Sequence, residues 1–346
     1  MRKFNIGEQI TKTIMSLYEQ ATTKVLTGEE FSEWFRATVG VRQGCILSPT
    51  LFNLFLERIM VEAIEELDDT GVSCGGLKVT NLRFADDIDL IGKNEEELQD
   101  LTNRLHDTSQ RFGMEISKEK SKTMVTGNGE DNIQLEIVIG DGKLEQVKSF
   151  KYLGATITEN GNSDQEIRNR IGAATSAMAR LNSMWGLQGI SLKNRMKITK
   201  AIAWATLLYG CESWTMNKKS MEKLKAFEMK FYRRMMKISW QERKTNEFVW
   251  NKVTETLGGR PESITETVKK RKLKYFGHQM RKPTAMTKTL IQGKVEGARE
   301  RGRPRRQWED DIKEWTGEGL RELSRMAMDR EKWRSSVHGW AHPRPT

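Results

Sequence analysis

The sequence predicts an α+β protein in which a mixed unit of helices and antiparallel strands precedes a helical unit and a basic, mainly helical region. Three observations predict this order. Apolar alternation and glycine-rich turns fill residues 1–160, helical spacing dominates from residue 161, and the chain is basic after residue 240. We therefore divide the chain into domains at residues 1–160, 161–240 and 241–346.

The composition is typical of a folded protein inside a cell. Hydrophobic residues make up 37% and charged residues 30%, and the apolar ones come in periodic blocks. No apolar run approaches the length of a membrane span, and the basic start lacks the apolar core of a signal peptide. Cys45, Cys74 and Cys211 are widely spaced, which indicates reduced thiols, and they form no zinc-binding spacing with the four histidines.

The positive charge is concentrated in one segment. The whole chain carries +11, whereas residues 269–306 alone hold 14 basic and two acidic side chains, so the remainder is close to neutral. Such a concentration indicates a polyanionic partner, most simply a nucleic acid.

The first elements are an amphipathic helix and a hairpin. Residues 8–19 carry Ile10, Ile14 and Tyr18 at helical spacing. Residues 21–26 and 33–41 then flank a Thr-Gly-Glu-Glu turn, which predicts two paired strands.

A loop and a buried helix follow. The loop runs from Val41 through Arg42, Gln43 and Gly44, and Ser48 and Pro49 form a helix-start signal, with Ser48 as the cap. The next residues, up to about 67, are apolar on most of their circumference, which predicts a helix packed in the core.

An acidic pair occupies the centre of the next predicted hairpin. Residues 82–92 read as a strand, a tight turn with Asp86 and Asp87, and a second strand. Adjacent carboxylates repel one another and are best tolerated where a divalent cation neutralises them. The alternative is an acidic turn that is exposed to water and binds no metal. The residues of the turn alone do not decide between these two interpretations.

The remaining elements are assigned from caps and periodicity. Asn94 is placed to cap a helix over residues 95–112, and Gly140-Asp141-Gly142 predicts a hairpin between residues 133–139 and 144–152. Helices are expected over residues 164–181, 192–209 and 220–238.

Four segments in order resemble a reverse transcriptase palm. They are Arg42-Gln43-Gly44 with its Ser48-Pro49 helix, Phe84-Ala85-Asp86-Asp87, residues 113–123, and Phe150 to Gly154. Their order and spacing resemble those of non-LTR retrotransposon (LINE-type) enzymes. Residues 208–214, Leu-Tyr-Gly-Cys-Glu-Ser-Trp, also resemble the thumb of that group, and residues 276–278 and 301–308 resemble its basic C-terminal region.

The resemblance implies a partial polymerase palm, a helical thumb, and RNA-directed DNA polymerase activity by two-metal nucleotidyl transfer. Asp86 takes the position of a Mg²⁺ (or Mn²⁺) ligand, and Asp87 is the supporting carboxylate and a second candidate metal ligand. Lys120 takes the position of a cation near the pyrophosphate. The partners would be an RNA template, a DNA primer or target and a dNTP, with no zinc and no membrane, in the cytoplasm and nucleus.

Other site residues follow from the same resemblance. Arg42, Gln43 and Gly44 would contact the template or nucleotide, and Tyr152, Leu153 and Gly154 would hold the primer. Separately, the Arg-Gly-Arg pattern after the thumb resembles the minor-groove core of an AT-hook, and the alternative is a basic loop that only touches phosphates. Either would bind nucleic acid through Arg301, Arg303, Arg305 and Arg306.

One departure from the family pattern concerns activity. The family needs another catalytic aspartate on an earlier strand, whereas the first aspartate here is Asp68. We therefore expect an N-terminally truncated chain that lacks the fingers and is inactive alone unless the missing polymerase segment is supplied elsewhere. The alternative function is a non-catalytic nucleic-acid-binding protein derived from a retrotransposon.

Overall fold

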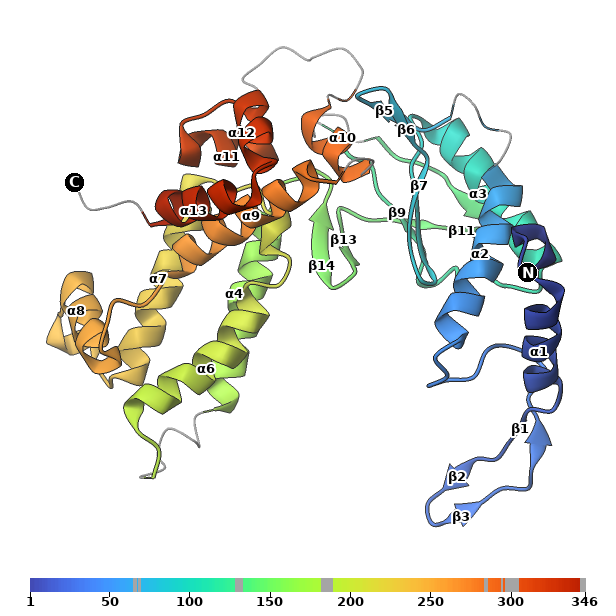
Figure 1. The fold of residues 1–346 in the computed structure, drawn as a ribbon, viewed down its shortest axis with the longest axis horizontal. Helices are drawn as coiled ribbons and strands as arrows, with labels where there is room; N and C mark the ends of the chain where they lie inside the picture. The colour runs from blue at the N-terminus through green and yellow to red at the C-terminus, as the bar shows by residue number, and fades with distance from the viewer. Residues whose placement is uncertain are drawn as a thin grey trace. The chain divides into compact units, whose positions relative to one another are not determined.

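The computed structural model describes residues 1–64, 67, 70–127, 133–181, 189–282, 286–293, 295 and 305–342. These residues form two compact units (Figure 1). Unit 1 comprises Met1–Val72, Val79–Ser121 and Glu136–Leu144, and unit 2 comprises Ser73–Lys78, Lys122–Leu135 and Glu145–Thr346. The three-domain division at residues 160 and 240 stays a prediction.

Unit 1 is built on two packed helices. Its helical elements are η1 (Arg2–Phe4), α1 (Glu8–Glu19), α2 (Ser48–Ile64) and α3 (Glu95–Arg111). The core lies between α2 and α3, where Ile59 and Met60 meet Leu105, and the Phe55 and Phe112 rings cross edge to face at 5.9 Å. Burying such side chains stabilises the pair by about 1.5–3 kcal/mol each.

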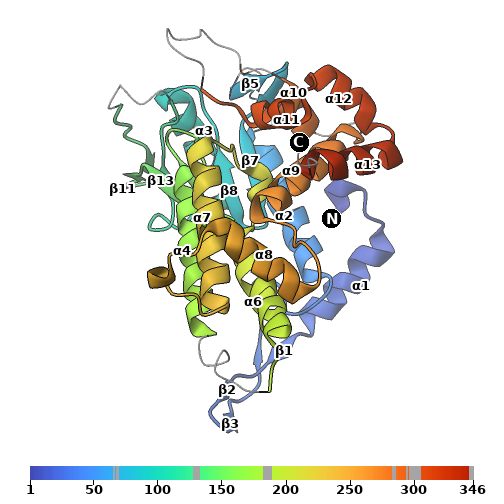
Figure 2. The same cartoon turned by 90° about the vertical axis from the view of Figure 1, so that its left-hand side faces the viewer.

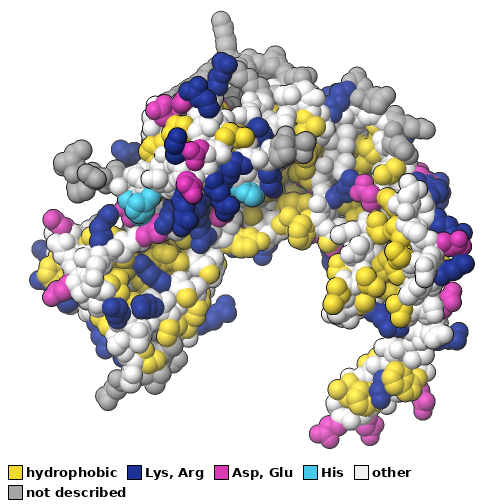
Figure 3. All heavy atoms as spheres, viewed as in Figure 1, with side chains coloured by type: hydrophobic (Ala, Val, Ile, Leu, Met, Phe, Trp, Pro, Cys, Tyr) yellow, Lys and Arg dark blue, Asp and Glu magenta, His cyan; other side chains and the backbone are white. Residues whose placement is uncertain are grey.

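The strands of unit 1 are short and pair as antiparallel ladders. The ladders are β1 (Thr22–Thr23) with β4 (Phe35–Arg36), β2 (Leu26–Thr27) with β3 (Glu30–Phe31), β7 (Asn81–Phe84) with β8 (Asp87–Leu90), and β10 (Val138–Ile139) with β11 (Gly142–Lys143). A further pair joins β5 (Val72–Cys74) to β6 (Leu77–Val79), and most of this hairpin, Ser73–Lys78, belongs to unit 2. Hydrophobic side chains stay exposed on the β2–β3 hairpin (Figure 3).

Unit 2 begins with four short strands. The ladder of β9 (Lys122–Thr123) with β12 (Glu145–Gln146) is parallel, and that of β13 (Ser149–Tyr152) with β14 (Ala155–Thr158) is antiparallel. The helical elements that follow are α4 (Asp164–Arg180), α6 (Leu192–Leu207), η2 (Cys211–Ser213), α7 (Lys218–Met235), η3 (Trp240–Glu242), α8 (Asn246–Leu257), α9 (Ile264–Met280), α10 (Met286–Gln292), α11 (Trp308–Thr316), α12 (Leu320–Ala327) and α13 (Arg330–Ala341).

Two hydrophobic cores hold these helices together. The first lies among α4, α6, α7 and α8, which run beside one another in Figures 1 and 2, and it buries Trp204, Phe231 and Tyr232. The second packs α9 against α11, α12 and α13 around Phe276 and Trp333. Gly277 is required there, because a Cβ at this position would lie 2.1 Å from Nε1 of Trp333.

The predicted α+β class is confirmed, and most predicted elements are present. Helix α1 has the predicted bounds, and Asn94 caps α3 by accepting a 2.9 Å hydrogen bond from the Glu97 amide. Ser48 differs from its prediction as a cap, because it is the first residue of α2 and its hydroxyl donates to the Arg42 carbonyl instead. None of the described helices combines the length and the apolar character that crossing a bilayer requires.

Candidate catalytic hairpin and its surroundings

The acidic pair lies at the tip of the β7–β8 hairpin. Ala85 and Asp86 form the turn, and Asp87 opens β8 opposite Phe84. Ala85 has φ of 53°, a left-handed conformation that costs an L-residue about 1–2 kcal/mol. The sequence did not predict this strain.

Alternation along the hairpin decides which way its side chains face. Ile88 and Leu90 pack against the α2–α3 core, so Asp87 and Asp89 lie on the opposite face of β8. Arg83 in β7 pairs with Glu57 of α2 at 2.8 Å, which fixes the hairpin on the helix.

The three carboxylates of this hairpin have different surroundings. Asp86 and Asp87 are exposed and, among the described residues, neither forms an ion pair. Asp89 lies opposite Leu82 and is partly buried, and this burial raises its pKa. The exposed pair is therefore available to a cation, whereas Asp89 is partly withdrawn from water.

The hairpin carboxylates fit one kind of divalent metal site. Within the described part of the chain no group of three His, Cys, Asp or Glu side chains comes together as a metal cage. A Mg²⁺ site that works on nucleotides needs only one or two carboxylates, because waters and substrate phosphates supply the other oxygens. Asp86 and Asp87 fit that kind of site.

The predicted Arg42–Gly44 loop is fixed between α1 and α2. The Arg42 guanidinium donates to the Leu17 carbonyl at 3.0 Å and lies over the Tyr18 ring at 5.9 Å. The Ser48 hydroxyl donates to the Arg42 carbonyl at 2.6 Å and shares a 3.2 Å hydrogen bond with Tyr18. Gln43 and Gly44 stay exposed. The loop is thus held by its Arg42 and presents Gln43 and Gly44 outward.

Lys120 differs from the two lysines beside it. Lys118 forms an ion pair with Asp141, and Lys122 forms one with Glu145 at 2.8 Å. Lys120 is exposed, and no ion pair of Lys120 is found among the described residues. Its charge is therefore the one of the three that is free for a ligand.

The predicted primer turn lies in unit 2, between β13 and β14. Leu153 and Gly154 both have positive φ, at 47° and 80°, which is the geometry of a tight hairpin turn. The two carbonyls of the turn accept hydrogen bonds from side chains of the helical region: Tyr209 donates to Leu153 at 2.9 Å, and Arg170 donates to Gly154.

Comparisons with known proteins concern the family that the sequence resembles. Residues 1–157 match the reverse transcriptase (RNA-dependent DNA polymerase) family. A 274-residue alignment, at 28% identity, covers 75% of this chain and 95% of an uncharacterized transposon-derived protein of Caenorhabditis elegans. The Pol polyprotein of a type-1 R2 retrotransposable element of Nasonia vitripennis is 29% identical over 46% of this chain, and the RNA-directed DNA polymerase of the Drosophila melanogaster mobile element jockey is 22% identical over 75%.

The chain is thus similar to LINE-type reverse transcriptases. It spans 16% of the Nasonia R2 polyprotein and 28% of the jockey polymerase. The family performs nucleotidyl transfer with divalent metals and has nucleic acids and nucleotides as partners.

The predicted basic C-terminal residues are only partly described. Arg301 and Arg303 lie outside the described residues. Arg305 is exposed and donates to the Asn160 carbonyl at 2.9 Å, while Arg306 binds Asp311 at 2.8 Å and Glu314 at 2.5 Å. Arg306 thus has an internal role, and the binding of nucleic acid by these arginines stays a prediction.

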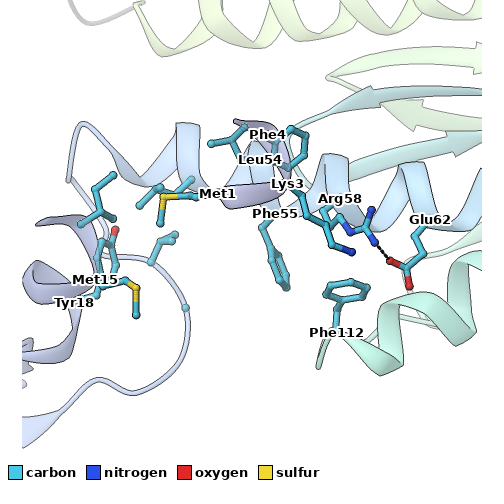
Figure 4. Close-up of a pocket in the computed structure, with 14 residues that line it drawn as sticks. Met1, Lys3, Phe4, Met15, Tyr18, Leu54, Phe55, Arg58, Glu62 and Phe112 are labelled. Atoms are coloured by element: carbon cyan, nitrogen blue, oxygen red, sulfur yellow. Dashed lines mark hydrogen bonds and ion pairs between the residues drawn. The ribbon is translucent and has the colours of Figure 1, made fainter. Parts of the chain in front are cut away.

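A cavity of about 690 Å³ in unit 1 is not lined by the carboxylates of the β7–β8 hairpin (Figure 4). Its walls are mainly apolar, with Phe4, Leu54 and Phe55 among them, and the Arg58–Glu62 pair at one end. It contains none of the predicted metal ligands, so we do not assign catalysis to it.

Several contacts that organise unit 2 left almost no signal in the sequence. Tyr209 and Arg170 reach the Leu153–Gly154 turn from 56 and 16 residues away. Lys272 and Asp311, 39 residues apart, form a fully buried ion pair. The Leu208–Trp214 motif was the one sequence signal that pointed to Tyr209. No local pattern indicated that Lys272 or Asp311 would be buried.

Proposed function

We propose that this chain acts in RNA-directed DNA synthesis, with Asp86 and Asp87 holding a divalent metal at the primer end. The observation that carries the proposal is the exposed carboxylate pair, placed at a hairpin tip that is anchored on the α2–α3 core by Ile88, Leu90 and the Arg83–Glu57 pair. The match of residues 1–157 to the reverse transcriptase family supports the same role.

The chain's own residues divide the work as follows. Asp86 would hold the metal with Asp87 in support, and the bound ion would supply activation of the primer 3′-oxygen and dispersal of charge on the leaving pyrophosphate. Lys120 places a free positive charge for the pyrophosphate. Gln43 and Gly44 face the template or the dNTP, and Gly44 allows close approach because it lacks a Cβ.

The proposed partners are an RNA template, a DNA primer or target, a dNTP, and Mg²⁺ or Mn²⁺. We propose that the protein acts in the cytoplasm and nucleus, because an enzyme with an RNA template and a DNA target needs access to both nucleic acids.

Primer extension on an RNA template tests the proposal. Wild-type chain and Asp86→Asn are compared with Mg²⁺ or Mn²⁺, and Asp100→Asn serves as the control because Asp100 is an α3 carboxylate paired with Arg104. Extension that Asp86→Asn abolishes and Asp100→Asn preserves supports a polymerase and contradicts the expectation that the chain is inactive alone. Equal extension by all three overturns the role of Asp86.

A second function is favoured by the charge distribution. Residues 269–306 hold 14 basic and two acidic side chains, and Figure 3 shows Lys and Arg side chains gathered where α9 and α13 lie. A non-catalytic nucleic-acid-binding protein would use this charge alone. Binding of RNA–DNA hybrid without extension, unchanged in Asp86→Asn, supports this alternative.

A further inference from the structure

The Leu208–Trp214 motif lies between α6 and α7 and has no role in the proposed chemistry. Its residues contact three other parts of unit 2: the β13–β14 turn, helix α9 and helix α11. A segment with so many partners has the geometry of a junction between these elements.

The contact with the turn is made by Tyr209. Its hydroxyl donates to the Leu153 carbonyl at 2.9 Å, and a Cβ on Gly154 would lie 3.5 Å from its ring. The side chain is 51% exposed, so the ring is not a core residue whose burial explains its place. Its distinctive contact is the hydrogen bond to the turn.

Arg170 of α4 completes the hold on the turn. Its guanidinium donates to the Gly154 carbonyl and lies 4.5 Å from the centre of the Tyr209 ring. Glu166, which is buried, fixes Arg170 by a 2.5 Å ion pair and accepts a 2.7 Å hydrogen bond from the Thr156 amide in β14. One network therefore ties both the turn and its second strand to α4.

The other end of the motif is fixed to the C-terminal helices. The Arg271 guanidinium donates to the Leu208 carbonyl at 3.1 Å, and Nζ of Lys272 donates to the Trp214 carbonyl at 2.7 Å. Nε1 of Trp308 donates to the Glu212 carbonyl at 2.8 Å. The backbone on both sides of Tyr209 is thus held, and the hydroxyl has a fixed place from which to bind the turn.

We propose that Tyr209 and Arg170 are positioning residues that set the Leu153–Gly154 turn against the primer strand. The proposal deepens the proposed function and rests on it, because it takes this turn as the primer contact. It gives the Leu208–Trp214 motif the task of joining the turn to helices α4, α9 and α11.

Photo-crosslinking from the strand beside the turn tests the proposal. A crosslinker is attached to Lys151→Cys, an exposed position in β13, in a Cys45→Ser background, and the full chain is bound to an RNA template with a labelled DNA primer. Tyr209→Phe removes only the hydroxyl, and Arg170→Lys keeps the charge but loses the guanidinium fork. Tyr275→Phe in α9 is the matched control.

The expected result is a crosslink near the primer 3′ end that falls about fivefold in Tyr209→Phe, the effect of losing one hydrogen bond. Arg170→Lys should also lower the crosslink yield, and Tyr275→Phe should leave it at the wild-type value. The affinity for the duplex and the Tm should stay unchanged in all three variants. Wild-type crosslinking in both Tyr209→Phe and Arg170→Lys would overturn the positioning role.

Two other outcomes also contradict the proposal, and they are distinguishable. A parallel loss of Tm and duplex affinity in Tyr209→Phe would mean that the bond supports the fold and does not direct the turn. A bound duplex that never crosslinks to the wild-type chain would show that this turn is no primer contact, which removes that part of the proposed function as well.

Discussion

At the scale of single residues, the site depends on two exposed carboxylates and on an unfavourable backbone angle beside them. Asp86 and Asp87 lack ion-pair partners among the described residues, and Ala85 holds φ of 53° to bring them to the hairpin tip. Strain of this kind is kept where the surrounding structure imposes it, and it is common at functional sites.

Replacing Ala85 by glycine tests this strain. Glycine adopts positive φ freely, and the relief outweighs its larger unfolded-state entropy, so we expect Ala85→Gly to stabilise the chain by about 0.5–1 kcal/mol. Urea unfolding measures the change. Ala155→Gly, in a strand without positive φ, should destabilise instead. A loss of stability in Ala85→Gly would contradict the strain.

Glu228 of α7 gives a pH dependence. Burial is the main cause that raises the pKa of Glu228 from 4.5 to about 7, and the nearby Glu266 acts in the same direction. The Ile264 amide, Lys200 and Tyr232 act to lower this pKa. Because the folded state holds this proton more tightly than the unfolded chain, the stability that Glu228 contributes is complete below about pH 4.5 and is lost as the pH rises through 7.

Substitution by glutamine removes this titration and keeps the acceptor for the Ile264 amide. Between pH 5 and 8 the wild type should lose on the order of 2–3 kcal/mol more free energy of unfolding than Glu228→Gln does. Urea unfolding at the two pH values measures it. Parallel pH curves for the two proteins would contradict the buried, protonated state of Glu228.

At the scale of elements, each half of the predicted site has its own support. The β7–β8 hairpin is fixed on α2 and α3 by packing and by the Arg83–Glu57 pair. In unit 2, α9 is joined to α11 by the Lys272–Asp311 pair, in which both side chains are fully buried and Asp311 also accepts from the Met216 amide at 2.8 Å. Burial lowers the pKa of Lys272 to about 8, although Asp311 acts to raise it.

Removal of one partner from this pair should be costly. Lys272→Met leaves Asp311 buried with Arg306 as its remaining cation, and we expect a loss of about 3–5 kcal/mol in the free energy of unfolding. The exposed pair of Lys332 and Asp329 is the control, because Lys332→Met should cost less than about 1 kcal/mol. Equal effects of the two substitutions, in urea unfolding, would contradict the structural role of the buried pair.

How much the sequence reveals differs between local and distant features. The bounds of α1, the Asn94 cap, the hairpin at Gly140 and the acidic turn were predictable, because each depends on spacing or on turn residues within a few positions. Ser48 was misassigned as a cap because its hydroxyl bonds to Arg42. The hold of Tyr209 on Leu153 and the Lys272–Asp311 pair arise from helix packing, which leaves no short-range pattern.

At the scale of the whole molecule, the chain combines a nearly neutral majority with one basic segment. Residues 269–306 supply more than the net charge of +11, and several of these side chains lie on α9. Lys274 and Lys282 are exposed, and no ion pair of either is found among the described residues. They are therefore suited to contact phosphates.

Salt dependence of nucleic-acid binding tests this surface. We expect the affinity for an RNA–DNA hybrid to fall steeply with salt. Lys274→Gln with Lys282→Gln should reduce the slope of log affinity against log salt by about 1 for each phosphate that a lysine no longer neutralises. Lys12→Gln, on α1 and paired with Glu8, is the control. An unchanged slope in the double variant would place the nucleic acid on another surface.

Binding of Mn²⁺ tests the role of Asp86 most directly, because it does not require turnover. Electron paramagnetic resonance measures free Mn²⁺ with the chain, an RNA template with DNA primer, and a dNTP. We predict that Asp86→Asn weakens Mn²⁺ binding by about tenfold or more, because one of two ligand charges is lost, and that Asp100→Asn leaves it unchanged. Equal Mn²⁺ binding by wild type and Asp86→Asn would contradict the assignment of the hairpin as the metal site.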